Sequence, residues 1–330
     1  MKEQDIRPQE LLERYVELSA QDAKKYFSNV ERRDVPCVAC RAKDAIYQFS
    51  KYGFDYAICN KCDTLYQTPR PSPDAFEHFY RDSESSNYWA NVFFPAVAEI
   101  RREKIVKPKG EGLSSLCDKI GLEVNNIIDI GAGYGVFLDE WRKRNPGVNM
   151  VAVEPSYSLA NECRKKKLHV VESMAEQVSG YDDFADLVIC FEVLEHVYNP
   201  LDFLNTLKNM ARPGGYVFIS TLCIDGFDLQ ILWDKSTQIS PPHHINFISV
   251  KGFELLFKEA GLTDVQVLTP GKLDVDIVQN QIKKNPDLIS NEIFLQKILN
   301  DNNKAIEFQK FLADNQLSSH AWVIGKKSKE

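Results

Sequence analysis

The chain has 330 residues, of which 44% are hydrophobic and 26% are charged, and this balance allows one full hydrophobic core with a smaller appended module. Its formal net charge of −7 disfavours a long basic track along a phosphate backbone, so we expect a small molecule as the partner rather than nucleic acid. The sequence has neither a membrane-spanning apolar run nor an apolar segment after Met1, so we expect a cytoplasmic protein without a membrane partner.

Residues 1–30 are expected to form an N-terminal helix. Between Leu11 and Phe27, apolar side chains recur at the spacing of an amphipathic helix. Most helices of this kind pack their apolar face against a neighbouring element, so we assign no further role to this one.

Four of the eight cysteines form two C-x2-C pairs that are eighteen residues apart: Cys37, Cys40, Cys59 and Cys62. In a reducing compartment, two such pairs bring four thiolates within reach of one ion, and this ligand set is typical of structural zinc. The residues between the pairs resemble short strands around Tyr47 and Tyr56. The sequence therefore predicts a zinc-binding ribbon over residues 31–70, with a closed site that leaves no position for a substrate.

Residues 71–114 follow a proline-rich connection and are predicted to form connecting helices. The aromatic segment from Tyr88 to Pro95 either covers a ligand site as a lid or packs on the core, and core packing is favoured because aromatic clusters are usually buried. A basic cluster follows, and a solvated helix face explains it most simply: Arg101, Arg102, Lys104, Lys107 and Lys109.

A glycine-rich turn interrupts the apolar run that begins at Ile127. The run carries one acid, Asp129, and three glycines at alternate positions follow it: Gly131, Gly133 and Gly135. A helical pattern then begins at Val136, so the stretch is typical of strand, tight turn and helix. Val136 stands where a dinucleotide-binding fingerprint requires its last glycine, so that type of site is disfavoured.

The D-x-G-x-G-x-G stretch resembles the first motif of class I S-adenosylmethionine-dependent methyltransferases. Further matches to this family follow over residues 115–270 and in a last strand at 320–325. The resemblance implies an α/β fold with a seven-stranded Rossmann-like sheet of strand order 3-2-1-4-5-7-6, whose seventh strand is antiparallel. A small N-terminal zinc ribbon would precede this sheet.

The resemblance also implies a set of residues for S-adenosylmethionine. The glycine turn with Asp129 would hold the cofactor, and Glu154, followed by Pro155, lies nineteen residues after Gly135, where an acid accepts both ribose hydroxyls. The turn after the third strand would hold the adenine through Ser173, Met174 and Ala175. Phe191 and Glu192, at the end of the fourth strand, would complete the cofactor site.

Methyl transfer from a sulfonium requires a nucleophile held in line, and a base when the nucleophile carries a proton. Glu195 and His196 follow the fourth strand, but similar residues in the family mainly shape the pocket. His243 and His244 follow two prolines beyond the fifth strand, and imidazole titrates near working pH. A structural turn explains these two histidines equally well, so both interpretations stay open.

The S-adenosylmethionine-binding domain is assigned to residues 115–330, with a helical insertion at 277–314 that packs, covers the acceptor site or offers a homodimer surface. A zinc module joined to this core is similar to bacterial sugar methyltransferases, including deoxysugar C-methyltransferases. The similarity implies O-, N- or C-methylation of a sugar or nucleotide-linked sugar in carbohydrate biosynthesis. The alternatives are an RNA methyltransferase and a non-catalytic binding protein that retains the fold.

Overall fold

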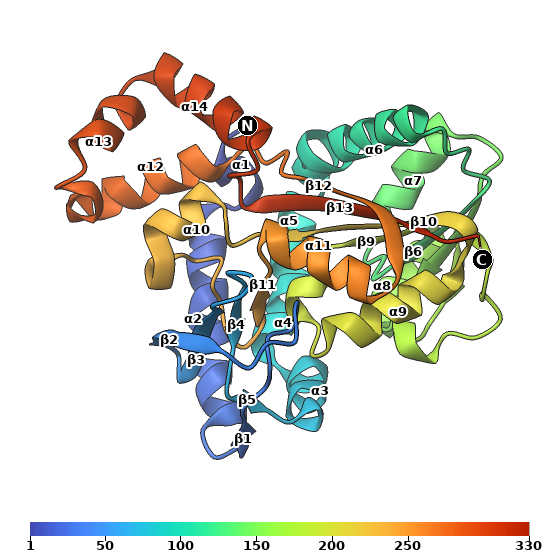
Figure 1. The fold of residues 1–330 in the computed structure, drawn as a ribbon, viewed down its shortest axis with the longest axis horizontal. Helices are drawn as coiled ribbons and strands as arrows, with labels where there is room; N and C mark the ends of the chain where they lie inside the picture. Colours follow the sequence, from blue (N-terminus) through green and yellow to red (C-terminus); the bar gives the residue numbers. More distant parts are fainter. Residues whose placement is uncertain (330) are drawn as a thin grey trace. The chain divides into compact units, whose positions relative to one another are not determined.

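The computed structural model describes residues 1–329, which fold as two compact units (Figure 1). Unit 1 comprises Met1–Val97, Leu222–Phe253 and Val267–Ala321. Unit 2 comprises Ala98–Thr221, Glu254–Gln266 and the residues from Trp322 onward. Among the helices of residues 1–329, none combines the length and hydrophobicity that crossing a membrane requires.

Unit 2 contains most of a seven-stranded sheet. Its spatial order is β12-β13-β10-β9-β6-β7-β8, and the four pairings from β10 to β8 are parallel. The strands are β6 (Asn126–Ile130), β7 (Asn149–Val153), β8 (His169–Val171), β9 (Ala185–Phe191), β10 (Ala211–Leu222), β12 (Leu262–Leu268) and β13 (His320–Lys327). Numbered along the chain, this order is 3-2-1-4-5-7-6, so the predicted fold class and strand order are confirmed.

Helices cover both faces of this sheet, which is why its central strands are apolar on both sides. In Figure 1, α6 and α7 lie on one side of the sheet, and α9 and α11 lie on the other. The helices are α6 (Lys107–Ile120), α7 (Val136–Arg144), α8 (Tyr157–Lys165), α9 (Pro200–Met210) and α11 (Val250–Glu259). Leu138, Trp141, Leu187 and Phe218 lie in the core that this arrangement encloses.

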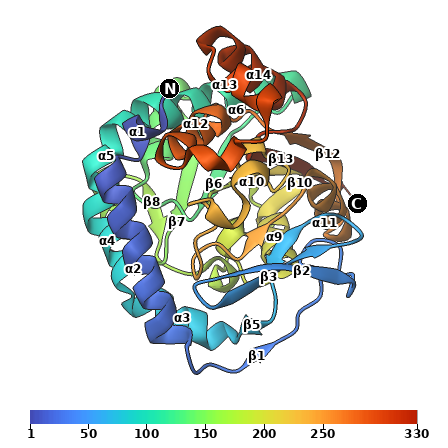
Figure 2. The same cartoon turned by 90° about the vertical axis from the view of Figure 1, so that its left-hand side faces the viewer.

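Unit 1 contains the long helix α2 (Gln9–Phe27) and a four-stranded sheet of order β11-β4-β3-β2 (Figure 2). The strands of this sheet are β2 (Ala45–Lys51), β3 (Phe54–Cys59), β4 (Leu65–Gln67) and β11 (Asn246–Phe247). The strands predicted between the cysteine pairs are therefore present. The two-residue strand β11 was not predicted; Asn246 pairs with Tyr66 of β4, far away in the sequence.

The segment between the ribbon and unit 2 is helical. Strands β1 (Arg32–Arg33) and β5 (Arg70–Pro71) pair before it, and α3 (Pro73–Asp82), α4 (Glu84–Tyr88), the π-helix η1 (Trp89–Phe93) and α5 (Phe94–Arg101) follow. Trp89 and Phe93 stack on each other with ring centres 4.4 Å apart, and both contact Tyr15 of α2. The aromatic segment thus packs against the N-terminal helix.

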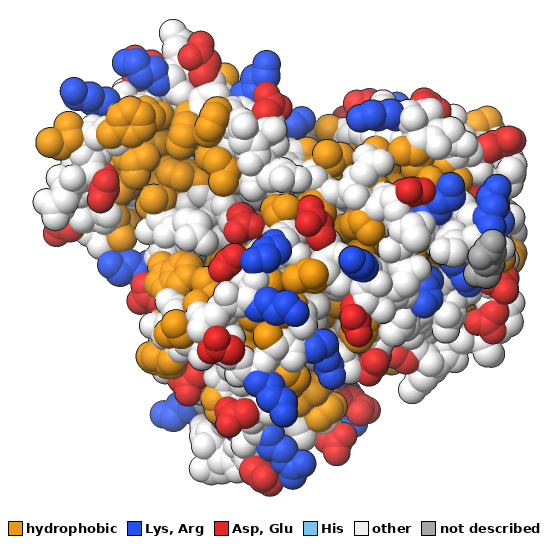
Figure 3. Space-filling model, viewed as in Figure 1, with side chains coloured by type: hydrophobic (Ala, Val, Ile, Leu, Met, Phe, Trp, Pro, Cys, Tyr) orange, Lys and Arg blue, Asp and Glu red, His pale blue; other side chains and the backbone are white. Residues whose placement is uncertain are grey.

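The insertion between the last two strands forms a helical group in unit 1. It contains α12 (Asp274–Lys284), α13 (Ile293–Leu299) and α14 (Asn302–Asp314), which share a small core with α10 (Phe227–Leu232). The helical insertion predicted at 277–314 is present as several helices, and α14 begins separately because the Asp301 carboxylate accepts the N–H groups of Asn303 and Lys304. Hydrophobic side chains gather on the surface over this group (upper left in Figure 3).

Candidate functional site

The glycine turn between β6 and α7 requires glycine for two different reasons. All three glycines have positive φ, between 55° and 73°. A Cβ at Gly131 would lie 2.8 Å from Val193, and one at Gly135 would lie 2.7 Å from Leu168, so packing also excludes side chains there. A Cβ at Gly133 would meet no described atom within 4 Å, so the middle of the turn is open to a ligand.

Glu154 connects the end of β7 to this turn. Its buried carboxylate accepts the Gly133 N–H at 2.8 Å through Oε2 and the Ser156 N–H at 2.9 Å through Oε1. Burial raises the pKa of Glu154, and these two N–H groups oppose the shift. Each carboxylate oxygen has a second acceptor position, so this geometry is compatible with the predicted ribose contact.

Asp129 lies beneath the turn as a buried acid. Its Oδ1 has no hydrogen-bond partner among residues 1–329, and burial, followed by the nearby Glu154, raises the pKa of its carboxyl to about 8. Buried polar atoms nearly always have a partner, so this oxygen fits a ligand that brings hydrogen-bond donors to the turn. The residues present therefore fit S-adenosylmethionine.

The loops after β7 and β8 contain four further predicted cofactor residues. Pro155 is exposed, Ser173 is half-buried and Ala175 is buried. Met174 is 52% exposed, and its thioether offers a polarizable apolar surface to a flat ring. Tyr157, at the start of α8, is an exposed aromatic side chain three residues after Glu154 and is not among the predicted cofactor residues.

Several of the predicted cofactor residues share one edge of the sheet in unit 2. The glycine turn follows β6, Glu154 follows β7, and Phe191 ends β9. Strands β7 and β9 flank β6, so the strand order runs from β6 through β7 to β8 in one direction and through β9 to β10 in the other. This position is the switch point where open α/β sheets bind ligands.

Glu192 lies at the same edge and contacts a lysine that was predicted to be solvated. Lys109 is only 8% exposed, and its Nζ lies 3.0 Å from Glu192 Oε1. The interpretation of Lys109 as part of a solvated helix face is therefore wrong. Other members of the basic cluster also form ion pairs, Arg102 with Asp139 and Glu140 of α7, and Lys107 with Glu103.

Glu195 and His196 lie in a 3-10 turn after β9, Leu194–His196. Glu195 is buried, and its Oε2 accepts the Thr221 hydroxyl at 2.7 Å. Burial, followed by the neighbouring Glu192, raises the pKa of Glu195 to about 8. This carboxyl therefore holds its proton at neutral pH, which suits a residue that shapes the pocket.

The raised pKa of Glu195 predicts a pH-dependent stability. Its folded pKa lies above the unfolded value near 4.5, so the native state binds more protons between about pH 4.5 and 8 and loses stability as the pH rises through this window. Replacing Glu195 with Gln removes this contribution. We expect the fall in Tm from pH 5.5 to 8.5 to be smaller by a few degrees in Glu195→Gln than in the wild type. If Tm falls by the same amount in both proteins between pH 5.5 and 8.5, the raised pKa of Glu195 is contradicted.

His243 and His244 belong to unit 1 and have different surroundings. His243 is buried, and its Nε2 lies 2.8 Å from Ser85 Oγ, whose hydroxyl donates to Asp22 at 2.6 Å. The Ser85 oxygen therefore accepts a hydrogen bond from the Nε2–H group of His243. The rings of Phe79 and Tyr15 lie 4.9 Å and 5.3 Å from the His243 ring, so this histidine is part of a packed polar network.

His244 is half-buried and has a defined tautomer. Its Nδ1 lies 2.6 Å from the Gln238 carbonyl oxygen, which can only accept a hydrogen bond. The proton of neutral His244 is therefore on Nδ1, and Nε2 carries the lone pair. Of these two neighbouring histidines, His243 is buried and His244 is the more exposed.

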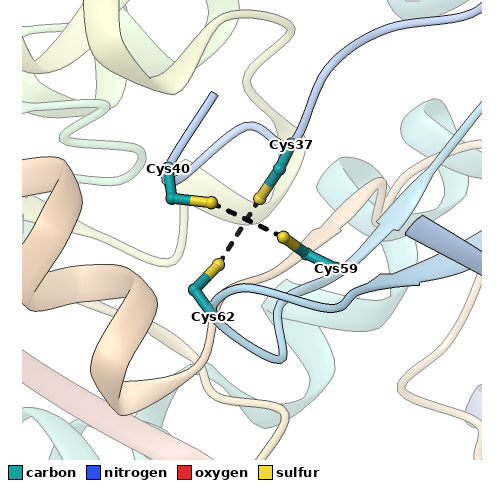
Figure 4. A group of neighbouring side chains, drawn as sticks. All are labelled: Cys37, Cys40, Cys59 and Cys62. Atoms are coloured by element: carbon teal, nitrogen blue, oxygen red, sulfur yellow. Dashed lines mark hydrogen bonds between the residues drawn. The ribbon is translucent and has the colours of Figure 1, made fainter. Parts of the chain in front are cut away.

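The four cysteines of unit 1 converge on one point (Figure 4). Their Sγ atoms all lie within 4.8 Å of one another, with 3.5 Å between Cys37 and Cys62 and between Cys40 and Cys59. Both pairs have the same turn, in which the residue after the second cysteine has positive φ and donates its N–H to the first cysteine's carbonyl at 2.9 Å. Tetrahedral zinc with bonds of about 2.3 Å requires sulfurs about 3.8 Å apart, so this group fits zinc.

Comparison with known proteins bears on the glycine turn and the seven-stranded sheet, and the four cysteines lie outside the matched residues. The sequence model of a family described as a methyltransferase domain matches residues 97–267. The chain therefore belongs to the family of class I S-adenosylmethionine-dependent methyltransferases, and the predicted class is confirmed.

Two relatives illustrate the range of this family. The ubiquinone biosynthesis O-methyltransferase of Aliivibrio fischeri (strain MJ11) is 33% identical over 109 residues, which are 31% of this chain and 46% of that protein. The tRNA U34 carboxymethyltransferase of Pseudoalteromonas atlantica is 29% identical over 166 residues, which are 47% of this chain and 50% of that protein. The chain spans about half the length of these curated relatives.

A solved structure supports the fold alone. The plantazolicin methyltransferase BamL, in complex with a desmethyl analogue and SAH, has a TM-score of 0.50 at 13% identity. The match covers 77% of this chain and 94% of that chain. The two relatives above are named for ubiquinone biosynthesis and for tRNA, so a sugar acceptor is not confirmed by them.

Proposed function

We propose that this chain transfers a methyl group from S-adenosylmethionine to a small-molecule acceptor of the carbohydrate class. The glycine turn carries the cofactor part of this proposal, because Gly133 is open, Glu154 accepts the Gly133 N–H, and Asp129 has an orphaned oxygen below it. The carbohydrate acceptor rests on the resemblance of the sequence to sugar methyltransferases. The bound cofactor supplies an activated methyl group. The chain orients the cofactor through these residues and removes a proton from the acceptor.

The choice of a small molecule over RNA is supported by the ion pairs of the basic cluster. Arg102, Lys107 and Lys109 are each paired with a carboxylate, and the net charge of the chain is −7. A site that neutralises several phosphates needs cations available for them. RNA remains the second candidate because a tRNA U34 carboxymethyltransferase is among the relatives.

We assign the role of acceptor base to His244 and an anchoring role to His243. The Gln238 carbonyl fixes the His244 tautomer, and the half-buried ring lies in a loop that Pro241 and Pro242 stiffen. Ser85 and Asp22 hold His243 between α2 and α4, which ties the loop to two helices. A cytoplasmic location and a homodimer stay predictions from the sequence.

Cofactor binding tests the proposal without a known acceptor. Wild-type protein is titrated calorimetrically with S-adenosylmethionine and separately with NADH, and we expect micromolar binding of the first alone. Failure of the wild type to bind S-adenosylmethionine contradicts the proposed function. Screening nucleotide sugars and tRNA with labelled cofactor then separates the two acceptor classes.

Replacing Glu154 with Ala is expected to weaken S-adenosylmethionine binding at least tenfold, or about 1.4 kcal/mol. The variant loses the acceptor predicted for the ribose and the contact that holds the Gly133 N–H at 2.8 Å. Glu123→Ala, at an exposed acid before β6, is the matched control and should bind normally. Equal affinities of the two variants contradict the role of Glu154.

A further inference from the structure

Lys109 is a buried cation in unit 2. It lies on the inward face of α6, where the buried positions follow helical spacing: Lys109, Gly110, Leu113, Leu116 and Cys117. Lysine is rarely buried to this extent unless its ammonium group is paired. Its burial therefore calls for a role other than solvation of the helix surface.

The Lys109 ammonium group reaches the carboxyl ends of two strands. Nζ donates to Ser220 Oγ of β10 at 2.8 Å and to Glu192 Oε1 at 3.0 Å, and the Ser220 hydroxyl donates to the same Oε1 at 2.7 Å. Nζ also lies 4.6 Å from the centre of the Phe191 ring. Two donors thus converge on one carboxylate oxygen, and the charge-assisted bond strengthens the arrangement.

The backbone of Glu192 is constrained as well. Its φ is +53°, in the left-handed region that non-glycine residues seldom adopt, and its N–H donates to the Ser220 carbonyl at 2.8 Å. Backbone of this kind is energetically unfavourable for a residue with a side chain and is concentrated at binding sites. The Glu192 side chain is nevertheless 37% exposed, so an anchored carboxylate is presented at the cofactor edge of the sheet.

The Glu192 carboxylate suits the methyl donor. Near neutral pH, the ammonium and carboxylate groups of S-adenosylmethionine have opposite charges and its sulfonium leaves the molecule positive, so an oriented carboxylate at the cofactor edge attracts its cationic groups. Lys109 contacts the Glu192 carboxylate directly, and its positive charge also lowers the pKa values of Asp129 and Glu195, against the larger effect of burial. Without Lys109, Glu192 would lose its charged partner and the orientation that the partner imposes.

We propose that Lys109 is a positioning residue of the cofactor site, which with Ser220 holds the Glu192 carboxylate in the orientation that binds the cationic methyl donor. This inference rests on the proposed cofactor use of the chain. Lys109 acts through Glu192 and takes no part in the transfer of the methyl group or of a proton.

A double-mutant cycle tests this inference by calorimetric titration with S-adenosylmethionine. We expect Glu192→Gln and Lys109→Met each to weaken binding about tenfold. In the Glu192→Gln background, Lys109→Met should change the Kd by less than about twofold, because the carboxylate it positions is already absent. Lys119→Met, at an exposed lysine of the same helix, is the matched control and should bind as the wild type.

Melting curves of the same proteins separate positioning from packing. If Lys109→Met lowers Tm but leaves the Kd unchanged, or if it weakens binding equally in both backgrounds, the inference is overturned. If the wild type does not bind the cofactor, the proposed function fails as well. If Lys109→Met does not fold, Ser220→Ala takes its place in the cycle. We expect Ser220→Ala to weaken binding about threefold in the wild-type background and to have no effect in the Glu192→Gln background. If the effects of Ser220→Ala and Glu192→Gln are additive, the inference is overturned.

Discussion

His244→Ala is expected to lower kcat about a hundredfold on the acceptor that the screen identifies, because the variant loses the group that takes the acceptor's proton. The Kd for S-adenosylmethionine should stay within about twofold of the wild-type value, since the predicted cofactor residues lie on β6, β7, β8 and β9. The two measurements together separate loss of a base from loss of the cofactor site.

His243→Ala is expected to act mainly on stability. The variant leaves Ser85 buried without its imidazole partner and opens a cavity beside Phe79, so Tm should fall by several degrees. His78→Ala, at an exposed histidine of α3, should change neither turnover nor Tm.

If His244→Ala retains wild-type turnover, the assignment of His244 as the base is contradicted.

The fold could be predicted because its signals are local. Each strand from β6 to β10 is an apolar run, the glycine turn follows β6, and helices separate the strands, so the rules for parallel crossovers restrict the order. Strand β11 has only two residues and acquires its role by pairing with β4, so no local pattern identifies it. Its pairing joins the ribbon to the part of the chain that carries the two histidines.

The site was less accessible to prediction because partners distant in sequence define it. Adjacent histidines look alike in a sequence, and their contacts with Ser85 and with the Gln238 carbonyl distinguish them in the structure. The helical phase could have identified Lys109, since it shares the spacing of Leu113 and Leu116. Lys109 was grouped with the neighbouring basic residues by its charge, although its helical position places it on the buried face of α6.

Removal of zinc is expected to produce the largest loss of stability. We propose that the four-cysteine group binds one structural zinc ion, so metal analysis of the purified protein should find one zinc per chain. Binding free energies of structural zinc are on the order of 10 kcal/mol, comparable with the whole stability of a domain. A strong chelator, or Cys37→Ser and Cys62→Ser, should therefore unfold the ribbon at temperatures where the wild type is folded.

Loss of zinc should also loosen residues 240–249, the segment that contains His243 and His244. Ser249 Oγ donates to the Cys62 carbonyl, and the Tyr56 hydroxyl donates to the His244 carbonyl at 2.7 Å. Loss of the ion would break both of these hydrogen bonds. We therefore expect limited proteolysis of the metal-free protein to cut in the ribbon and near residue 244. Cys117→Ser, at a buried cysteine of α6, is the control for losing a thiol without losing a ligand. A metal-free protein with wild-type Tm and proteolysis pattern contradicts a structural zinc ion, because the ribbon's short strands would then hold without it.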